Sequence, residues 1–147
     1  RKSILPGVNS RLDELQASIL RIKLKHLDSD NQKRRDLAKF YYDHLSPLPI
    51  ALPKISSNVQ SVFHLFVIQV EKRQSLLNFL ELSGIMAGIH YPLAIHQHPA
   101  YEGQISTVSD MSITEGIVQK IISLPMYPEL TISDADKIVK VLMKFYQ

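Results

Sequence analysis

The sequence contains no cysteine and no tryptophan among its 147 residues. Without cysteine, these residues form no disulfide framework, no thiolate zinc site and no cysteine nucleophile. No apolar run approaches the roughly 20 residues that a membrane-spanning helix needs, so we expect no membrane partner. The first residues carry no signal-peptide pattern, and we expect a cytoplasmic protein.

A strong excess of charge is also missing. Lys and Arg number 17 and Asp and Glu number 14, which leaves a net charge of +3. A nucleic-acid-binding protein needs its basic residues gathered on one face beside groups that read or stack on bases, so we expect no nucleic-acid partner. The sequence likewise lacks a Gly-x-Gly-x-x-Gly motif, a Walker phosphate loop and a Gly-x-Ser-x-Gly elbow.

What the sequence does contain is a globular balance of 45% apolar and 21% charged residues, in a length typical of one domain. Apolar spacing, turn residues and prolines predict a succession of helices and strands along the chain. These are a long helix from a cap at Ser10 to residue 45 with a break near 28–30, a loop at 46–61, a strand at 62–70, a helix at 73–82, a short strand at 85–89, a helix through 113–122, an extended piece at 123–126 and a last helix capped by Ser133.

This order of elements predicts an α+β fold, an α/β sandwich in which helices cover a small, mostly antiparallel sheet. A long helical segment at 1–46 leads into a small α/β domain at 47–147. The long helix need not belong to the core of that domain.

Three histidines, His90, His96 and His98, fall within nine residues of a loop at 90–103. They could ligate zinc, but the loop has neither Cys nor Asp and lacks the helical spacing of a metalloprotease. A ligand pocket fits better, since His, Tyr and Pro form a stiff wall that carries hydrogen-bonding groups. Surface histidines without a role are the remaining alternative.

A second candidate site lies at residues 7–11, where Asn9 and Arg11 stand at the start of the first predicted helix. Free backbone N–H groups at a helix start favour an anion, which an amide and a guanidinium would also bind. The alternative is a plain helix cap.

Four blocks of the sequence together resemble the DegT/DnrJ/EryC1/StrS family of pyridoxal-phosphate-dependent aminotransferases, which act on nucleotide-linked keto-sugars. The blocks occur in the family's order and span the chain from residue 7 almost to its end. They are GVNSRLDELQASILRIKLKHLD at 7–28, VFHLFVIQV at 62–70, GIHYPLAIHQHPAY at 88–101 and SLPMYPELT at 123–131.

The resemblance implies the C-terminal domain of a type I aminotransferase fold, together with the helix that leads into it. In the family, the N-terminal domain binds pyridoxal phosphate and carries the lysine that forms a Schiff base with it. Neither that domain nor that lysine motif is found in these residues. We therefore expect no catalytic residue here, no bound cofactor and no activity for this chain alone. The alternative is a non-catalytic, stand-alone ligand-binding or interaction module derived from such a domain.

The resemblance also implies a homodimer with its active site at the interface, a nucleotide-sugar substrate and an amino-acid donor. Asn9 is expected to reach the cofactor phosphate of the partner subunit, with Arg11 nearby. His90, Tyr91 and His96 are expected to border the sugar-nucleotide pocket. The loop departs from many relatives, which have Pro and Gln at the positions of Ala94 and His98, so the identity of the sugar stays open.

Overall fold

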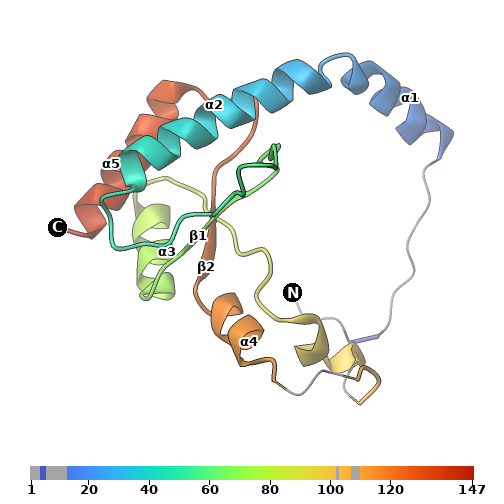
Figure 1. Cartoon of the computed structure of the whole chain (residues 1–147), viewed down its shortest axis with the longest axis vertical. Helices are drawn as coiled ribbons and strands as arrows, with labels where there is room; N and C mark the ends of the chain where they lie inside the picture. The colour runs from blue at the N-terminus through green and yellow to red at the C-terminus, as the bar shows by residue number, and fades with distance from the viewer. Residues whose placement is uncertain (1–3, 6–12, 102, 107–109) are drawn as a thin grey trace.

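The structure is a computed structural model that describes residues 4–5, 13–101, 103–106 and 110–147 (Figure 1). In the described residues its elements are α-helices, two short strands and two turns of 3₁₀ helix. In chain order they are α1 (Glu14–Leu24), α2 (Leu27–Leu45), β1 (Phe66–Gln69), α3 (Arg73–Leu82), η1 (Ile95–Gln97), η2 (Pro99–Tyr101), α4 (Ser112–Val118), β2 (Ile121–Leu124) and α5 (Ile132–Phe145). The helix predicted at 73–82 is confirmed with the same bounds.

The sheet is antiparallel, as predicted, and β1 pairs with β2 so that Phe66 lies opposite Leu124. Isolated backbone bridges widen it on both outer edges, where Ala51 pairs with Gln69 on β1 and Gly88 pairs with Ser123 on β2. The strand predicted at 62–70 is therefore shorter than expected. The strand predicted at 85–89 is wrong, because only the Gly88 bridge forms there.

The third helix was predicted too long. It ends at Val118, and Ile121 belongs to β2 instead, as does the next residue, Ile122. All four residues of β2 are buried. A short apolar run of this kind has the same appearance in a buried strand as in one turn of a buried helix, so spacing alone could not separate the two.

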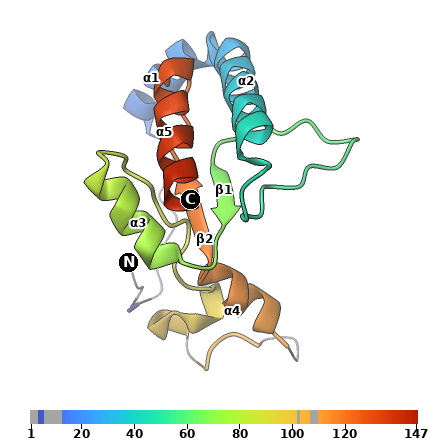
Figure 2. The same ribbon diagram turned by 90° about the vertical axis from the view of Figure 1, so that its left-hand side faces the viewer.

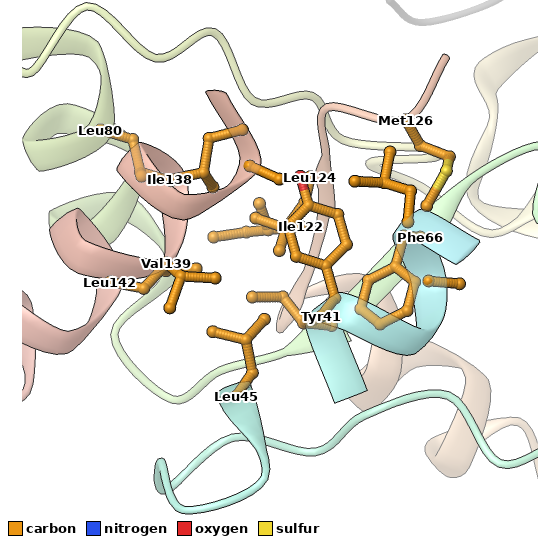
Figure 3. Packing of buried hydrophobic residues seen from close by; sticks show 14 of the residues in the cluster. Tyr41, Leu45, Phe66, Leu80, Ile122, Leu124, Met126, Ile138, Val139 and Leu142 are labelled. Atoms are coloured by element: carbon orange, nitrogen blue, oxygen red, sulfur yellow. The ribbon is translucent and has the colours of Figure 1, made fainter. Parts of the chain in front are cut away.

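The core lies where α2, α3 and α5 meet the two strands, and Figure 2 shows α2 and α5 side by side next to the sheet. Figure 3 shows the side chains that fill it, with Tyr41 and Phe66 in contact at a ring-centroid distance of 5.0 Å. The fully buried side chains include Tyr41, Leu45, Phe66, Ile68, Leu76, Leu80, Ile122, Val139 and Leu142.

One face of α2 belongs to this core, because Leu37, Ala38, Tyr41 and Leu45 are all buried at helical spacing. The end of the segment predicted as 1–46 therefore packs with residues of the 47–147 part. Burial also decides which residue of the first strand faces the helices: Phe66 is fully buried, whereas its neighbour Leu65 is only partly so.

The long first helix is interrupted at Lys25 and His26, a little before the expected break. The predicted cap Ser10 lies outside the described residues, and α1 instead has Asp13 as its N-cap. The Asp13 carboxylate accepts a 2.7 Å hydrogen bond from the backbone N–H of Gln16, which satisfies a donor that the first turn leaves free.

The last helix also starts earlier than predicted. Its N-cap is Thr131 rather than Ser133, and the Thr131 hydroxyl accepts from the backbone N–H of Asp134 at 3.1 Å. Within the described ranges, no helix combines the length and the apolar character needed to cross a membrane.

Two leucines of α3 provide a matched test of the core. Leu80 is fully buried, whereas Leu82 is 89% exposed. We expect Leu80→Ala to lower the free energy of unfolding by about 2–5 kcal/mol, because it leaves a cavity among packed side chains. Leu82→Ala should change it by less than about 0.5 kcal/mol. Urea denaturation of both variants measures the difference, and equal losses would contradict this placement of α3.

The buried phenol of Tyr41 should make stability depend on alkaline pH. Burial raises the pKa of Tyr41 well above its ordinary value, and neighbouring Tyr127 adds to the shift. Its stabilising contribution is therefore complete below pH about 10, where the unfolded phenol is still protonated, and is lost as the pH rises further. Tyr41→Phe should flatten this decline between pH about 9 and 11 while costing about 1 kcal/mol at neutral pH through the lost hydrogen bond. Denaturant unfolding at several pH values measures both effects, and identical alkaline slopes would contradict the assignment.

Candidate functional site

The loop that carries the predicted substrate-binding residues lies beside β2 and α4 at one end of the molecule, away from α2 and α5 (Figure 1). His90, Tyr91 and His96 all lie within the described residues. The predicted cofactor-binding residues Asn9 and Arg11 lie outside them, so their role stays a prediction.

His90 is attached to the sheet through its side chain. Its Nδ1 atom lies 2.9 Å from the hydroxyl oxygen of Ser123 in the middle of β2. Ser123 is only 4% exposed, and it exchanges two backbone hydrogen bonds with Gly88, of 2.8 and 3.0 Å. The strand pairing thus places Gly88, two positions before His90, next to Ser123, which is hydrogen-bonded to the His90 ring.

Tyr91 and His96 extend from this anchor in different ways. The ring of Tyr91 meets the ring of His90 edge-on at a centroid distance of 5.7 Å and is 69% exposed. The Nε2 atom of His96 lies 2.8 Å from a carboxylate oxygen of Glu115 in α4. The side chain of His96 is 16% exposed and that of Glu115 is 46% exposed, so this pair forms a partly shielded link between η1 and α4.

The loop is stiffened by its own hydrogen bonds. The backbone N–H of Ala94 donates to the side-chain carbonyl of Gln97, which closes the turn of η1. The backbone N–H groups of Gln97, His98 and Tyr101 each donate to a carbonyl three residues earlier. These bonds give the loop a defined course between the anchor at His90 and the link at His96.

A cavity of about 350 Å³ lies next to His90. Most of its walls are apolar, and His90 and Ser123 contribute the polar side chains. Its lining consists of Leu65, Met86, Ala87, Gly88, His90, Ser123, Leu124, Pro125 and Met126. Apolar walls with a few directed polar groups are typical of small-molecule sites.

The part of the cavity wall that directly follows β2, Pro125 and Met126, is hydrogen-bonded to α2. The hydroxyl of Tyr41 donates to the carbonyl of Pro125 at 2.9 Å, and the guanidinium of Arg34 donates to the carbonyl of Met126 at 3.0 Å. Because α2 is itself packed in the core, these hydrogen bonds attach the wall to the core of the fold.

A larger cavity, of about 830 Å³, lies elsewhere, and none of the predicted site residues lines it. It is bordered by α1, the start of α2 and the segments around His64 and Tyr127. Its walls include Leu20, Leu24 and other apolar side chains of an uncovered helix. This cavity is therefore separate from the loop that carries His90, Tyr91 and His96.

The three histidines of the loop do not converge on a metal ion. His90 and His96 contact different partners, Ser123 and Glu115. In the part of the chain that the structure describes, no group of three or more His, Cys, Asp or Glu side chains could hold an ion.

Sequence reasoning missed two residues of the site, Ser123 and Glu115. Ser123 had a detectable signal, because it is a lone hydroxyl in the apolar run of β2, and a buried polar side chain in such a run usually has a specific partner. Glu115 had none, since it resembles any exposed acidic residue of an amphipathic helix.

Comparisons with known proteins agree with the fold. The DegT/DnrJ/EryC1/StrS aminotransferase family model matches residues 1–143. A dTDP-3-amino-3,6-dideoxy-α-D-galactopyranose transaminase of Aneurinibacillus thermoaerophilus is 38% identical over 98% of this chain and 39% of its own length. A dTDP-3-amino-3,4,6-trideoxy-α-D-glucose transaminase of Streptomyces venezuelae is 40% identical over 90% of this chain and 35% of its own length.

Solved structures give the same result. The crystal structure of S. venezuelae DesV in complex with a ketimine intermediate superposes with a TM-score of 0.87 at 37% identity, over 96% of this chain and 38% of DesV. An aminotransferase from Brucella abortus gives a TM-score of 0.86 at 31% identity, over 95% of this chain and 37% of its own. The chain thus spans 35–39% of the length of these relatives.

The link between His96 and Glu115 should control the mobility of the loop rather than global stability. Partly exposed ion pairs contribute about 0–1 kcal/mol, so Glu115→Ala should barely change the unfolding midpoint. We expect it to accelerate amide hydrogen exchange at Gln97, His98 and Tyr101. Glu71→Ala is the control, because it removes a 2.8 Å ion pair with Lys120 outside the loop. Equal exchange rates in the two variants would contradict this role.

Proposed function

This chain belongs to the DegT/DnrJ/EryC1/StrS aminotransferase family, and we propose that it is the C-terminal part of an enzyme that transfers an amino group to a nucleotide-linked keto-sugar. The observation that carries the proposal is the match of nearly the whole chain to transaminases of dTDP-linked amino sugars. The family depends on pyridoxal phosphate, which supplies the electron sink of transamination when it is bound.

The exposed surface of α1 supports the view that this chain works within a larger polypeptide. None of its residues is buried, although it carries several large apolar side chains. Leu15, Ile19, Leu20, Ile22 and Leu24 are between 50% and 72% exposed. Contiguous apolar surface of this kind usually marks an interaction site. In the proposed enzyme, this helix is covered by another part of the polypeptide, equivalent to the part of the relatives that this chain does not match.

The loop at 90–101 is the proposed border of the sugar-nucleotide site. The cavity beside His90 offers apolar walls together with the hydrogen-bonding groups of His90 and Ser123. A sugar presents hydroxyl oxygens on one side and carbon-bound hydrogens on the other, and such a wall accommodates both. Exposed Tyr91 and the fixed ring of His96 would border the same ligand.

Asn9 and Arg11 are the residues that we propose to hold the cofactor phosphate, across the interface of a homodimer. An amide N–H and a guanidinium both donate hydrogen bonds, and a phosphate dianion accepts several at once. In this arrangement the cofactor domain of one subunit binds the first residues of the other. The amino donor is an amino acid and the enzyme works in the cytoplasm.

The direct test uses the complete polypeptide that contains this sequence. We expect the purified protein to bind pyridoxal phosphate, to form a dimer and to aminate dTDP- or UDP-linked keto-sugars with an amino acid as donor. Product formation is measured by mass spectrometry of the sugar nucleotide. A complete polypeptide that takes up no cofactor would contradict the proposal and favour the non-catalytic binding module.

Asn9→Ala in that polypeptide should weaken cofactor binding about ten- to a hundredfold. This is the expected effect of losing one hydrogen bond to a charged group, which contributes about 1.5–3 kcal/mol. Titration of the apoenzyme with pyridoxal phosphate, followed by visible absorbance, gives both dissociation constants. Asn58→Ala, in the exposed loop before β1, is the matched control and should bind as the wild type does. Equal affinities for Asn9→Ala and Asn58→Ala would contradict a role of Asn9 in holding the cofactor phosphate.

A further inference from the structure

Ser123 occupies an unusual place in the core. Among the residues that the structure describes, it is the one buried residue that is neither apolar nor aromatic. Its neighbours in β2, Ile122 and Leu124, are 0% and 2% exposed. A buried hydroxyl costs free energy unless it is hydrogen-bonded, so a serine at this position calls for a specific partner.

That partner is the ring of His90, which lies 33 residues away along the chain. In the described part of the chain, Nδ1 of His90 is the one hydrogen-bond partner of the Ser123 hydroxyl. A buried hydroxyl that donated to nothing would carry an unsatisfied proton, which proteins avoid. A hydroxyl that donates to Nδ1 satisfies its own proton and leaves the proton of a neutral imidazole on Nε2.

Gly88 confines the same ring from another direction. A Cβ atom placed on residue 88 would lie 2.7 Å from Cε1 of His90 and 3.3 Å from Nδ1. The first distance is shorter than any ordinary contact, so the imidazole fills the space that a side chain at residue 88 would take. Two backbone hydrogen bonds hold Gly88 against Ser123, so the two residues have a fixed relation to each other.

We propose that Gly88 and Ser123 form a seat for the imidazole of His90. This seat gives His90 a fixed orientation and a single tautomer, with its hydrogen-bond donor at Nε2. Among the described residues, Nε2 has no partner, and the cavity of about 350 Å³ lies beside the ring. Gly88 and Ser123 are thus positioning residues.

The seat decides what His90 contributes to binding. A neutral imidazole with its proton on Nε2 donates to an oxygen atom and cannot accept a proton there. His90 therefore recognises a carbonyl or hydroxyl oxygen of the ligand and does not act as a general base through Nε2. The identity of the ligand as a sugar rests on the proposed function, whereas the seat itself does not.

Nuclear magnetic resonance on this chain without ligand tests the seat. In a neutral imidazole, the nitrogen shifts report which nitrogen carries the proton. We expect the proton on Nε2 and a strong nuclear Overhauser effect between the Cε1 proton of His90 and the Cα protons of Gly88. Protonation on Nδ1 would overturn the direction of the hydrogen bond, and with it the proposal.

Three variants separate positioning from stability. Ser123→Ala should weaken the Overhauser effect and mix the two tautomers, and Ser123→Thr, which keeps the hydroxyl, should restore the wild-type spectrum. Gly88→Ala should displace the ring although Ser123 is intact. The imidazole signals of His96 serve as the internal control and should not change. An Overhauser effect of wild-type strength in both alanine variants would overturn the seat.

The complete enzyme tests the ligand part of the proposal. There, Ser123→Ala should raise the KM of the keto-sugar about tenfold, the effect of one hydrogen bond, and leave the KM of the amino donor unchanged. An active enzyme with an unchanged sugar KM would overturn the role of His90 as a sugar donor while the proposed function stands. An inactive complete enzyme would overturn the proposed function and the sugar assignment together, whereas the resonance data decide the seat independently.

Discussion

The complete burial of β2 is the constraint on which the rest of the structure depends. Its four residues are covered by helices and by neighbouring backbone, and β1 pairs along one edge while Gly88 pairs on the other. A strand enclosed in this way must satisfy every backbone hydrogen bond within the protein, because water cannot reach it. The antiparallel partner and the Gly88 bridge supply backbone hydrogen bonds on both edges of β2, and the bridge also fixes the start of the loop that follows residue 88.

The candidate site follows from this enclosed strand. Ser123 lies in β2 and holds His90, while the residues directly after β2 form a wall of the adjoining cavity. Tyr41 and Arg34 tie that wall to α2, which is packed in the core. The loop that carries His90 is thus tied to core elements by the hydrogen bonds of its own side chain and of Gly88. A binding loop supported in this way can present polar groups without a core of its own.

The core around β2 and the surface of α1 differ in how well their apolar side chains are covered. The core around β2 is closed within these residues, and its buried polar side-chain atoms have partners in the described part of the chain. The apolar face of α1 is open. A part of a larger aminotransferase would show that contrast. The core of one part is buried by residues of the same part, whereas a surface between two parts is buried only when both parts are present. It explains why this chain folds like the matching part of its relatives but leaves one helix uncovered.

Local pattern in the sequence determined α3 with its exact bounds, the helical character of the first and last segments, the proline-rich loop before β1 and the resemblance to the aminotransferase family. Those features depend on residues three or four positions apart or on short motifs. The strand assignment of Ile121 and the hydrogen bonds that join His90 to Ser123 and Arg34 to Met126 were decided only by tertiary structure. These partners are 33 and 92 residues apart, and no local periodicity encodes such pairings. They arise because burying β2 on both faces and both edges brings distant segments to one strand, and that is a property of the packed fold as a whole.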